Sequence, residues 1–501
     1  MSQINVNNLT FGYEGSFENV FENVSFTIDT DWKIGFIGRN GKGKTTFLRL
    51  LLGQYEYGGS ITSKVNFDYF PYEYDDNGDE AAVDMLENWK PDAEFWRVTA
   101  ELDKIGLEAD ILYRPFRSLS FGEKTKVMLA VLFAGENDFL LIDEPTNHLD
   151  GASRETVKEY LKSKEGFILV SHDADVLDAV TDHVLVLNRS SIEVMAGNFS
   201  TWWENKEKAD EFARRSNEKH LKEIGRLKSS IDRSSRWAEK NENTKIGYDP
   251  IKEHDRTKNA RSYIGAKTKK MQARVQNYKG RMEKHIEEKE GLLNDVERVF
   301  DLKLTPLVHC RDRLVNLREF RCRYKDSEKY VLDGLTFELK QGERVFLNGK
   351  NGCGKSTLIK LITGEEIDVE TEGIFEVAGN MVISYVSQDT TGLSGSLRDF
   401  SFARGLDYTR LLAILNRMDF DKAMYEKDIS EFSEGQKKKL LISASLMTPA
   451  HLYIWDEPLN YIDVFSRKQV EKLIEEFGPT MLVVEHDRRF REKIATRVLD
   501  L

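Results

Sequence analysis

Two copies of one glycine-rich motif constrain the fold of this chain more than any other feature of its sequence. The segments GRNGKGKTT (residues 38–46) and GKNGCGKST (residues 349–357) both fit the pattern G-x-x-x-x-G-K-[ST], and each follows an apolar run. A glycine-rich loop between a strand and a helix turns backbone N–H groups inward, where they bind phosphate oxygens. One match could be an ordinary glycine turn, but two copies in matching surroundings favour two phosphate-binding domains.

The residues that close each loop have defined tasks in such a site. Lys44 and Lys355 are expected to reach the β- and γ-phosphates of a nucleotide, and the hydroxyls of Thr45 and Ser356 to hold Mg²⁺. The sequence therefore predicts two nucleotide sites, each with a divalent cation.

An acidic pair follows four apolar residues downstream of each loop. We expect Asp143 and Asp456 to join the Mg²⁺ shell, and Glu144 and Glu457 to polarise the attacking water. An acidic pair at the end of a strand is often only solvated. Its repetition after both phosphate loops favours the catalytic interpretation.

A histidine then follows another apolar run in each half, as His172 and His486. A lone histidine in such a place is more often a structural cap, but its duplication favours a contact with the γ-phosphate and a sensor role.

A serine–glycine segment lies between the phosphate loop and the acidic pair of each half. LSFGEKTK (residues 119–126) and FSEGQKKK (residues 432–439) each place serine and glycine before a basic, amphipathic helix. As isolated strings they are weak signals of a helix N-terminus.

The apolar runs before the motifs are typical of buried parallel strands. We predict an α/β fold in which two P-loop nucleotide-binding domains are joined by a long antiparallel α-helical hairpin. The expected parts are a first domain, a hairpin linker and a second domain, at residues 1–202, 203–305 and 306–501. The hairpin is expected to consist of helices at 204–240 and 258–300, because Gly247 and Pro250 interrupt helical structure between them.

The charge of the chain is distributed unevenly. Its net charge is −12, yet residues 204–300 hold 25 Lys and Arg against 18 Asp and Glu. A basic middle between acidic ends indicates a surface that binds a polyanion. The alternative is a solvated helical linker whose charge is incidental.

Other features narrow the class of protein. No run of about 18 apolar residues is present that could span a bilayer, and the N-terminal residues lack the pattern of a signal peptide. The sequence has three cysteines without metal-ligand spacing, which argues against a disulfide framework, a zinc site and an iron–sulfur cluster. We expect a cytoplasmic protein with no membrane segment.

Taken in order, these motifs resemble the ATP-binding-cassette family over both domains. The resemblance adds D-loops at 147–150 and 460–463, and implies two ATP molecules, each bound between one domain's phosphate loop and the other domain's signature. The first implied site contains Gly38, Asn40, Gly41, Gly43, Lys44, Thr45, Thr46, Asp143, Glu144 and His172, with Ser433 and Gly435. The second contains Gly349, Asn351, Gly352, Gly354, Lys355, Ser356, Thr357, Gln388, Asp456, Glu457 and His486, with Ser120 and Gly122. Tyr13 and Tyr324 match the aromatic residue that stacks on adenine.

The sequence departs from the family pattern in two ways. Tyr72 stands where the family places the glutamine that Gln388 supplies in the second domain, so the two sites are expected to turn over differently. Phe121 and Glu434 occupy the position of the first glycine of the usual signature.

Two fused cassettes, no membrane segment and a basic hairpin together resemble the ABC-F branch, and GNFSTWWENKEK (residues 197–208) resembles the start of its linker. This resemblance implies a protein that binds the bacterial ribosome at the exit site, with the hairpin reaching past P-site tRNA toward the peptidyl-transferase centre and 23S rRNA. The basic residues expected near the hairpin tip are Arg233, Arg236, Lys240, Lys245, Arg256, Lys258, Arg261, Lys267, Lys269 and Lys270. Trp237, Tyr248 and Tyr263 are expected either to stack on bases or to pack within the hairpin.

Within that branch, WDEPLNYIDV (residues 455–464) is similar to Lsa-type proteins, which protect ribosomes from lincosamides, pleuromutilins and streptogramin A. Only 47 residues separate Tyr72 from Ser120, which leaves little room for the longer arm of many housekeeping relatives. We expect no C-terminal extension to contribute. A housekeeping factor that relieves stalled ribosomes and the ATPase subunit of a membrane transporter remain the alternatives, and a DNA-maintenance ATPase is less favoured.

Overall fold

The computed structural model divides the chain into two units. One unit holds Met1–Trp202 together with Phe300–Leu501, and the other holds Trp203–Val299. The residues that the structure describes are 2–13, 19–75, 78–136, 138–147, 149–188, 191–243, 269, 273–282, 284, 304–325, 327, 329–350, 352–418 and 420–501.

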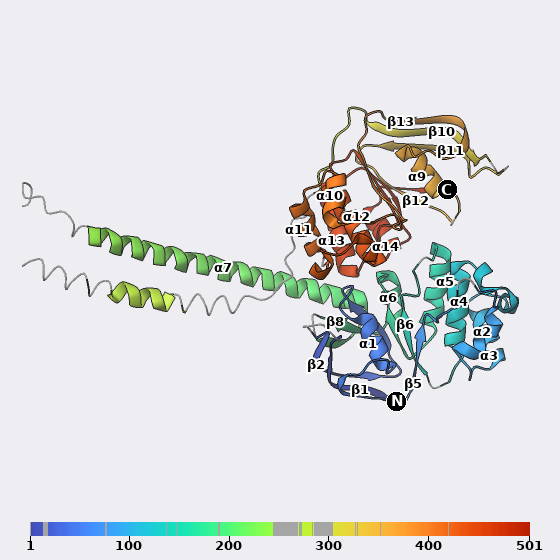
Figure 1. Cartoon of the computed structure of the whole chain (residues 1–501), viewed down its shortest axis with the longest axis horizontal. Helices are drawn as coiled ribbons and strands as arrows, with labels where there is room; N and C mark the ends of the chain where they lie inside the picture. Colours follow the sequence, from blue (N-terminus) through green and yellow to red (C-terminus); the bar gives the residue numbers. More distant parts are fainter. Residues whose placement is uncertain are drawn as a thin grey trace, which may run out of the picture. The chain divides into compact units, whose positions relative to one another are not determined.

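The first cassette contains two sheets, drawn in blue to teal in Figure 1. Its strands are β1 (Gln3–Phe11), β2 (Phe21–Asp29), β3 (Lys33–Gly38), β4 (Gly58–Thr62), β5 (Asn66–Phe70), β6 (Asp138–Asp143), β7 (Phe167–Val170), β8 (His183–Leu187) and β9 (Ile192–Ala196). An antiparallel sheet has the order β2-β1-β4, and a larger sheet has the order β5-β6-β7-β3-β8-β9. In the larger sheet β9 pairs antiparallel with β8, and the other pairs are parallel.

Helices follow the strands of this cassette in an alternating α/β order. They are α1 (Lys44–Leu51), α2 (Ala82–Trp89), α3 (Phe95–Lys104), α4 (Phe121–Leu132), α5 (Gly151–Lys162) and α6 (Ala174–Val180), with 3₁₀ turns at Ala109–Tyr113 and Phe116–Ser118.

The second cassette repeats this plan and is drawn in yellow to red. Its strands are β10 (Arg313–Tyr324), β11 (Leu332–Lys340), β12 (Arg344–Asn348), β13 (Val369–Val377), β14 (Ile383–Val386), β15 (Leu452–Asp456), β16 (Met481–Val484) and β17 (Arg497–Asp500). Its helices are α9 (Lys355–Thr363), α10 (Leu397–Ala403), α11 (Tyr408–Arg417), α12 (Glu434–Met447), α13 (Val464–Phe477) and α14 (Arg488–Ile494), with 3₁₀ turns at Lys422–Met424 and Ile429–Glu431. The sheets have the orders β11-β10-β13 and β14-β15-β16-β12-β17, the latter parallel throughout.

The central strands explain why the motifs meet. Strands β7 and β16 are buried at every residue, as expected for parallel strands covered on both faces. Their carboxyl ends lie beside those of β3 and β6 in the first cassette, and of β12 and β15 in the second. Each sheet therefore brings a phosphate loop, an acidic pair and a switch histidine to one edge, where ligands of parallel α/β sheets usually bind.

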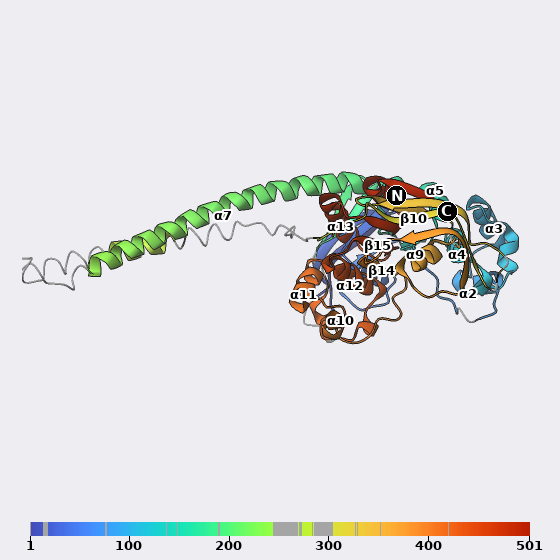
Figure 2. The same cartoon turned by 90° about the horizontal axis from the view of Figure 1, so that it is seen from above.

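Helix α7 (Phe199–Asn243) is 45 residues long, and Figure 2 shows it as one continuous, gently bowed helix. The helix predicted at 204–240 is thus present and begins earlier, because Asn198 Oδ1 caps it by accepting from the Thr201 backbone N–H at 3.1 Å. Of the second predicted hairpin helix, residues 273–282 are described and are helical. Tyr278 lies beside α7, with its hydroxyl 2.9 Å from Ser230 Oγ. The predicted breaker spans residues 241–255; its first three residues belong to α7, and the rest, from residue 244 onward, lies outside the described residues.

The first turn of α7 is tied to both cassettes. Asp178 of α6 accepts hydrogen bonds from the backbone N–H of Ser200 at 2.7 Å and from its hydroxyl. Arg489 of α14 lies 2.5 Å from the same carboxylate and 2.7 Å from Asp175. One arginine of the second cassette therefore meets the carboxylate that holds the start of the linker helix.

Within the described residues, no helix combines the length and apolar character needed to span a bilayer.

Candidate ATP sites

Both phosphate loops have backbone shapes that require glycine. Gly43 and Gly354, which precede α1 and α9, have φ values of 107° and 102°. A Cβ atom on Gly43 would lie 2.5 Å from a methyl group of Val20, so a side chain is excluded by space as well as by conformation.

The loop lysines fold back over their own loops. Lys44 Nζ donates to the Gly38 carbonyl at 2.7 Å, and Lys355 Nζ donates to the Gly349 carbonyl at 2.8 Å. Burial lowers the pKa of Lys44, although the nearby Glu144 carboxylate opposes this effect. Both lysine side-chain nitrogens therefore lie against their phosphate loops.

The predicted magnesium ligands come together at both sites. Thr45 Oγ1 donates to Asp143 Oδ2 at 2.8 Å, and Ser356, Gln388 and Asp456 line one cavity in the second cassette. Hydroxyl, carboxylate and amide oxygens are hard ligands of the kind Mg²⁺ prefers, so these donor sets fit that ion.

The glutamates after these aspartates are held in a strained backbone conformation. Glu144 and Glu457 have φ values of 52° and 47°, which non-glycine residues rarely adopt. Burial, reinforced by the charge of Asp143, raises the pKa of Glu144 to about 8. Burial, reinforced by the charges of Glu485 and Asp456, raises the pKa of Glu457 to about 7. A carboxylate with such a pKa is suited to accept a proton near neutral pH.

The switch histidines lie next to these glutamates. His172 Nε2 is 3.3 Å from Glu144 Oε1, and His486 Nε2 is 3.9 Å from Glu457 Oε1. Burial lowers the pKa of His172 well below its ordinary value and that of His486 to about 4. Both imidazoles are therefore neutral at pH 7, and each can donate one hydrogen bond and accept another.

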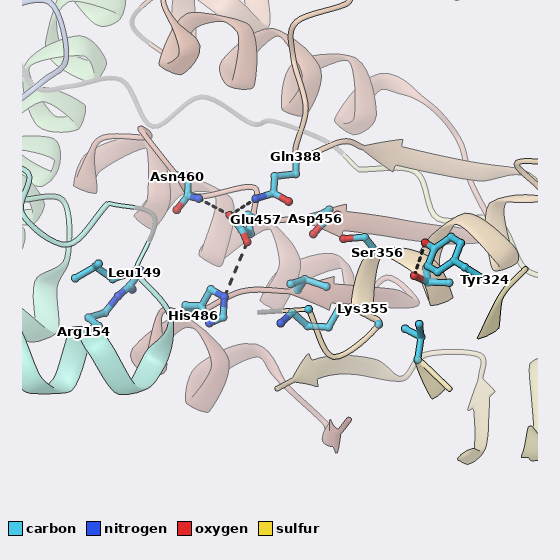
Figure 3. A pocket seen from close by; sticks show the side chains of 15 residues that line it. Leu149, Arg154, Tyr324, Lys355, Ser356, Gln388, Asp456, Glu457, Asn460 and His486 are labelled. Atoms are coloured by element: carbon cyan, nitrogen blue, oxygen red, sulfur yellow. Dashed lines mark hydrogen bonds and ion pairs between the residues drawn. The ribbon is translucent and has the colours of Figure 1, made fainter. Parts of the chain in front are cut away.

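The second site is a cavity of about 410 Å³ that both cassettes line. Figure 3 shows Leu149 and Arg154 of the first cassette on one side and the motif residues of the second on the other. Gln388 Nε2 and Asn460 Nδ2 both donate to Glu457 Oε2, at 2.9 and 2.7 Å. The catalytic candidate is thus held by two amides.

Figure 3 also labels Tyr324 at the end of this cavity away from Leu149, with Lys355 between the two. The residues lining it are Leu149, Arg154, Tyr324, Val331, Gly352, Gly354, Lys355, Ser356, Thr357, Gln388, Asp456, Glu457, Asn460, Val484 and His486. The predicted signature residues Ser120 and Gly122 are not among them. A Cβ atom on Gly122 would lie 3.7 Å from the side chain of Leu149, which lines the cavity.

At the first site, the second cassette lies directly against the phosphate loop. Asn40 Nδ2 donates to the Tyr461 carbonyl at 2.6 Å. A Cβ atom on Gly435 would lie 2.7 Å from that carbonyl and 3.6 Å from Asn40 Nδ2, so the signature requires glycine there. Ser433 caps α12 by accepting from the Gln436 N–H, as Ser120 caps α4 by accepting from the Glu123 N–H.

The two predicted adenine-stacking tyrosines are arranged alike. Tyr13 and Tyr324 place their hydroxyls 2.7 and 3.0 Å from Thr46 and Thr357, and both residues are exposed. Their rings are therefore accessible to a planar ligand beside the loop. Of the other predicted loop residues, Gly41 and Gly352 lie in left-handed turns, whereas Asn351 lies outside the described residues.

In the first cassette Tyr72 stands where the family places its glutamine, but a different tyrosine contacts the predicted magnesium ligand. Tyr72 Oη donates to Asp68 at 2.8 Å, and its ring stacks on Trp89 with centroids 5.3 Å apart. Tyr69 reaches the site instead, donating its hydroxyl to Asp143 Oδ2 at 3.2 Å. The sequence has several tyrosines at and just after the end of β5, which is consistent with this contact. It did not indicate which of them would contact Asp143.

The basic run of the second signature helix is buried. Lys438 and Lys439 are 2% and 3% exposed. Lys438 Nζ donates to the Asp456 carbonyl at 3.3 Å, and Lys439 Nζ lies 2.8 Å from Asp463. Burial would raise the pKa of Asp463, but the charge and hydrogen bond of Lys439 outweigh it and lower that pKa. The sequence predicts a basic, amphipathic helix here; these lysines are buried and support the acidic strand and the D-loop.

The second signature helix also carries one departure from the family pattern. Glu434 accepts a hydrogen bond from the Thr390 hydroxyl, which follows Gln388 in sequence. Phe121, at the equivalent place in the first cassette, is exposed.

Two phosphate loops, each with an acidic pair and a switch histidine at the carboxyl edge of a parallel sheet, define a tandem ATP-binding-cassette protein. The sequence pattern of the family described as "ABC transporter" matches residues 21–147 and 332–460, and the chain belongs to this family. The predicted fold of two cassettes and the predicted ATPase activity are confirmed.

The chain is 27% identical over 489 residues to the ribosome protection protein VmlR of Bacillus subtilis, covering 96% of this chain and 84% of that protein. It is 26% identical over 534 residues to the energy-dependent translational throttle protein EttA of Escherichia coli K12, covering 96% and 89%. These relatives confirm the predicted place of the chain in the ABC-F subfamily.

Among solved structures, the chain is similar in fold to the archaeal ribosome recycling factor aABCE1, in a complex with the stalk protein aP1. The TM-score is 0.60 at 19% identity, over 98% of this chain and 87% of that one. At this identity the likeness concerns the fold.

Proposed function

We propose that this ATPase binds the bacterial ribosome at the exit site and protects the peptidyl-transferase centre from antibiotics of the lincosamide, pleuromutilin and streptogramin A type. Its expected location is the cytoplasm, and its expected contacts are 23S rRNA and P-site tRNA. The similarity to VmlR over nearly the whole chain supports this function.

The observation that carries the proposal is the basic surface of α7. Its described part between residues 222 and 236 exposes five cations and two acids. The exposed cations are Lys222, Arg226, Lys228, Arg233 and Arg236. Lysine and arginine on a long helix neutralise backbone phosphates without reading a sequence, which suits a folded RNA surface.

We expect ATP to be the nucleotide that this protein hydrolyses, with Mg²⁺ bound at each site. At the second site, Ser356, Gln388 and Asp456 would hold the metal ion, whose chemistry when bound is to neutralise phosphate charge. Lys355 adds a fixed positive charge at the loop. At the first site, Thr45 and Asp143 have the corresponding role.

The catalytic step assigned to this chain is a proton transfer. Glu457 accepts a proton from the attacking water, while its second oxygen stays fixed by two amides. Neutral His486 contacts the γ-phosphate. Glu144 and His172 are the matching pair at the first site. Closure of the cassettes on ATP must favour a ribosome-bound state over the free state, or ATP could not drive the cycle.

The double variant Glu144→Gln with Glu457→Gln tests this proposal. Both substitutions keep the side-chain shape but remove the proton acceptor, so ATP should bind without turnover. We expect the variant to co-sediment with bacterial ribosomes when ATP is present and not when it is absent. A matched control adds Lys44→Ala and Lys355→Ala, which should abolish the ATP-dependent fraction.

Drug susceptibility then separates the alternatives. Ribosome trapping together with protection of cells from these antibiotics supports the proposal. Trapping without protection supports a translation factor of the EttA kind. Absence of ribosome binding with intact ATP binding contradicts the proposal and favours a transporter subunit.

A further inference from the structure

Leu459, which directly precedes the D-loop of the second cassette (residues 460–463), is held by two buried side chains. The backbone N–H of Leu459 donates to Glu485 Oε2 at 3.1 Å, and the Leu459 carbonyl accepts from Arg467 Nη2 at 2.8 Å. Glu485 is 5% exposed and Arg467 9% exposed. One peptide segment is therefore fixed on both sides, by a buried carboxyl group and by a buried guanidinium group, and a hydrogen bond to a charged group is stronger than one between neutral groups.

Each of these side chains also holds a second segment. Arg467 donates to the Ile462 carbonyl at 2.9 Å and to Asp487 Oδ2 at 3.1 Å. Glu485 Oε1 accepts from the backbone N–H of His486 at 2.8 Å and of Asp487 at 3.3 Å. The D-loop and the switch that carries His486 are thus joined through one carboxylate.

The described residues of the first cassette do not show this arrangement. Ser171 occupies the place of Glu485, and its hydroxyl accepts from the nearby Asp173 N–H at 3.1 Å. Arg154 occupies the place of Arg467 and pairs with Asp173 at 3.1 Å. Its Nε is buried without a hydrogen-bond partner in the part of the chain that the structure describes.

The D-loop of the second cassette contacts Glu457, the proposed catalytic base. Asn460 directly follows Leu459, and its amide donates to Glu457 Oε2 at 2.7 Å. We propose that Glu485 is a positioning residue that, with Arg467, fixes the D-loop so that Asn460 holds Glu457 in its reactive orientation. This inference rests on the proposed role of Glu457.

The electrostatic surroundings of Glu485 agree with its proposed positioning role. Burial raises the pKa of Glu485, and the positive charge of Arg467 opposes the rise. A buried acid of this kind is costly unless it is paired and hydrogen-bonded, so its partners are kept in place. A small displacement of a reacting group costs up to about a hundredfold in rate.

The test uses full-length protein with Glu144→Gln, so that turnover reports the second site. In this background, Glu485→Ser reproduces the first cassette: it can keep the local bond to the Asp487 N–H but cannot reach Leu459. We expect kcat to fall about tenfold or more, with KM for ATP unchanged within about twofold. Glu485→Gln keeps one acceptor oxygen and should retain more turnover than Glu485→Ser.

A matched control is Glu492→Ser, the same substitution at an exposed position of α14. Glu492 pairs there with Arg488 at 2.7 Å. It should leave kcat unchanged. Arg467→Lys should lower kcat as Glu485→Ser does, and the double variant should lose less than the product of the two effects, because both act on one loop.

Three outcomes decide the matter. Loss of kcat at constant KM, partly restored in Glu485→Gln, supports the positioning role. Turnover of Glu485→Ser equal to that of the control, or a loss confined to KM, overturns it. Glu457→Gln in the same background tests the proposed base separately: if it leaves turnover intact, the assignment of Glu457 fails, whatever Glu485 does.

Discussion

The two ATP sites share their motifs but differ in the groups that surround them. In the second cassette, Gln388 and Asn460 fix Glu457. In the first, Glu144 lies beside His172, and a tyrosine hydroxyl contacts Asp143. A repeated motif therefore fixes where the reacting groups lie, whereas residues outside the motif decide how firmly each one is held.

The largest expected difference concerns the two glutamates. We expect the second site, where two amides hold Glu457, to carry most of the turnover, so Glu457→Gln should lower steady-state ATP hydrolysis by about a hundredfold, the least that a general base contributes. Glu144→Gln should lower it by less than about fivefold, because the second site remains intact. Phosphate release by each single variant measures this, and a larger loss from Glu144→Gln would reverse the comparison.

The pH dependence of each site gives the next largest effect. A base must be ionised, so hydrolysis should rise with pH up to the pKa of the glutamate and then level off. With Glu144→Gln the rise should centre near pH 7, and with Glu457→Gln near pH 8. One unit below its midpoint, each rate should be about tenfold under its plateau. Initial rates at ATP concentrations well below KM, between pH 5.5 and 9, test this, because they report the pKa values of the free enzyme; coincident midpoints would show that the two environments act alike.

The glutamine position should separate the sites by about tenfold. Gln388→Ala removes a hydrogen bond to Glu457 and should lower second-site turnover by about that factor. Tyr72→Ala should leave first-site turnover within about twofold, because its hydroxyl is bonded to Asp68 and its ring to Trp89. Each variant is measured with the other site silenced, and equal losses would contradict the difference.

The contact between the cassettes should give the smallest effect. Arg489 is partly exposed, so Arg489→Ala should lower the free energy of unfolding by about 1 kcal/mol or less. Thermal unfolding in low and high salt measures this, and the difference from the parent protein should shrink as salt screens the ion pairs. A salt-independent loss would mean that packing, not charge, supplies the contact.

The sequence predicted the elements that repeat and the residues at their ends. Lys44, Asp143 and His172 follow apolar runs, and the parallel pairing of those runs brings them to one edge. The role of Glu485 was not predicted, because its effect depends on the fold bringing a switch strand beside a D-loop. A basic run usually marks a solvated face, so the sequence indicated exposed side chains at Lys438 and Lys439. In the structure both side chains are buried.

The anchor of the linker helix has a mechanical consequence. Because Asp178 and Arg489 meet at Ser200, a rotation between the cassettes acts on the first turn of α7. At 1.5 Å per residue, a 45-residue helix is a lever arm of about 65 Å. Along a single unbroken helix, a change of angle in the first turn would give a displacement that grows with distance from that turn.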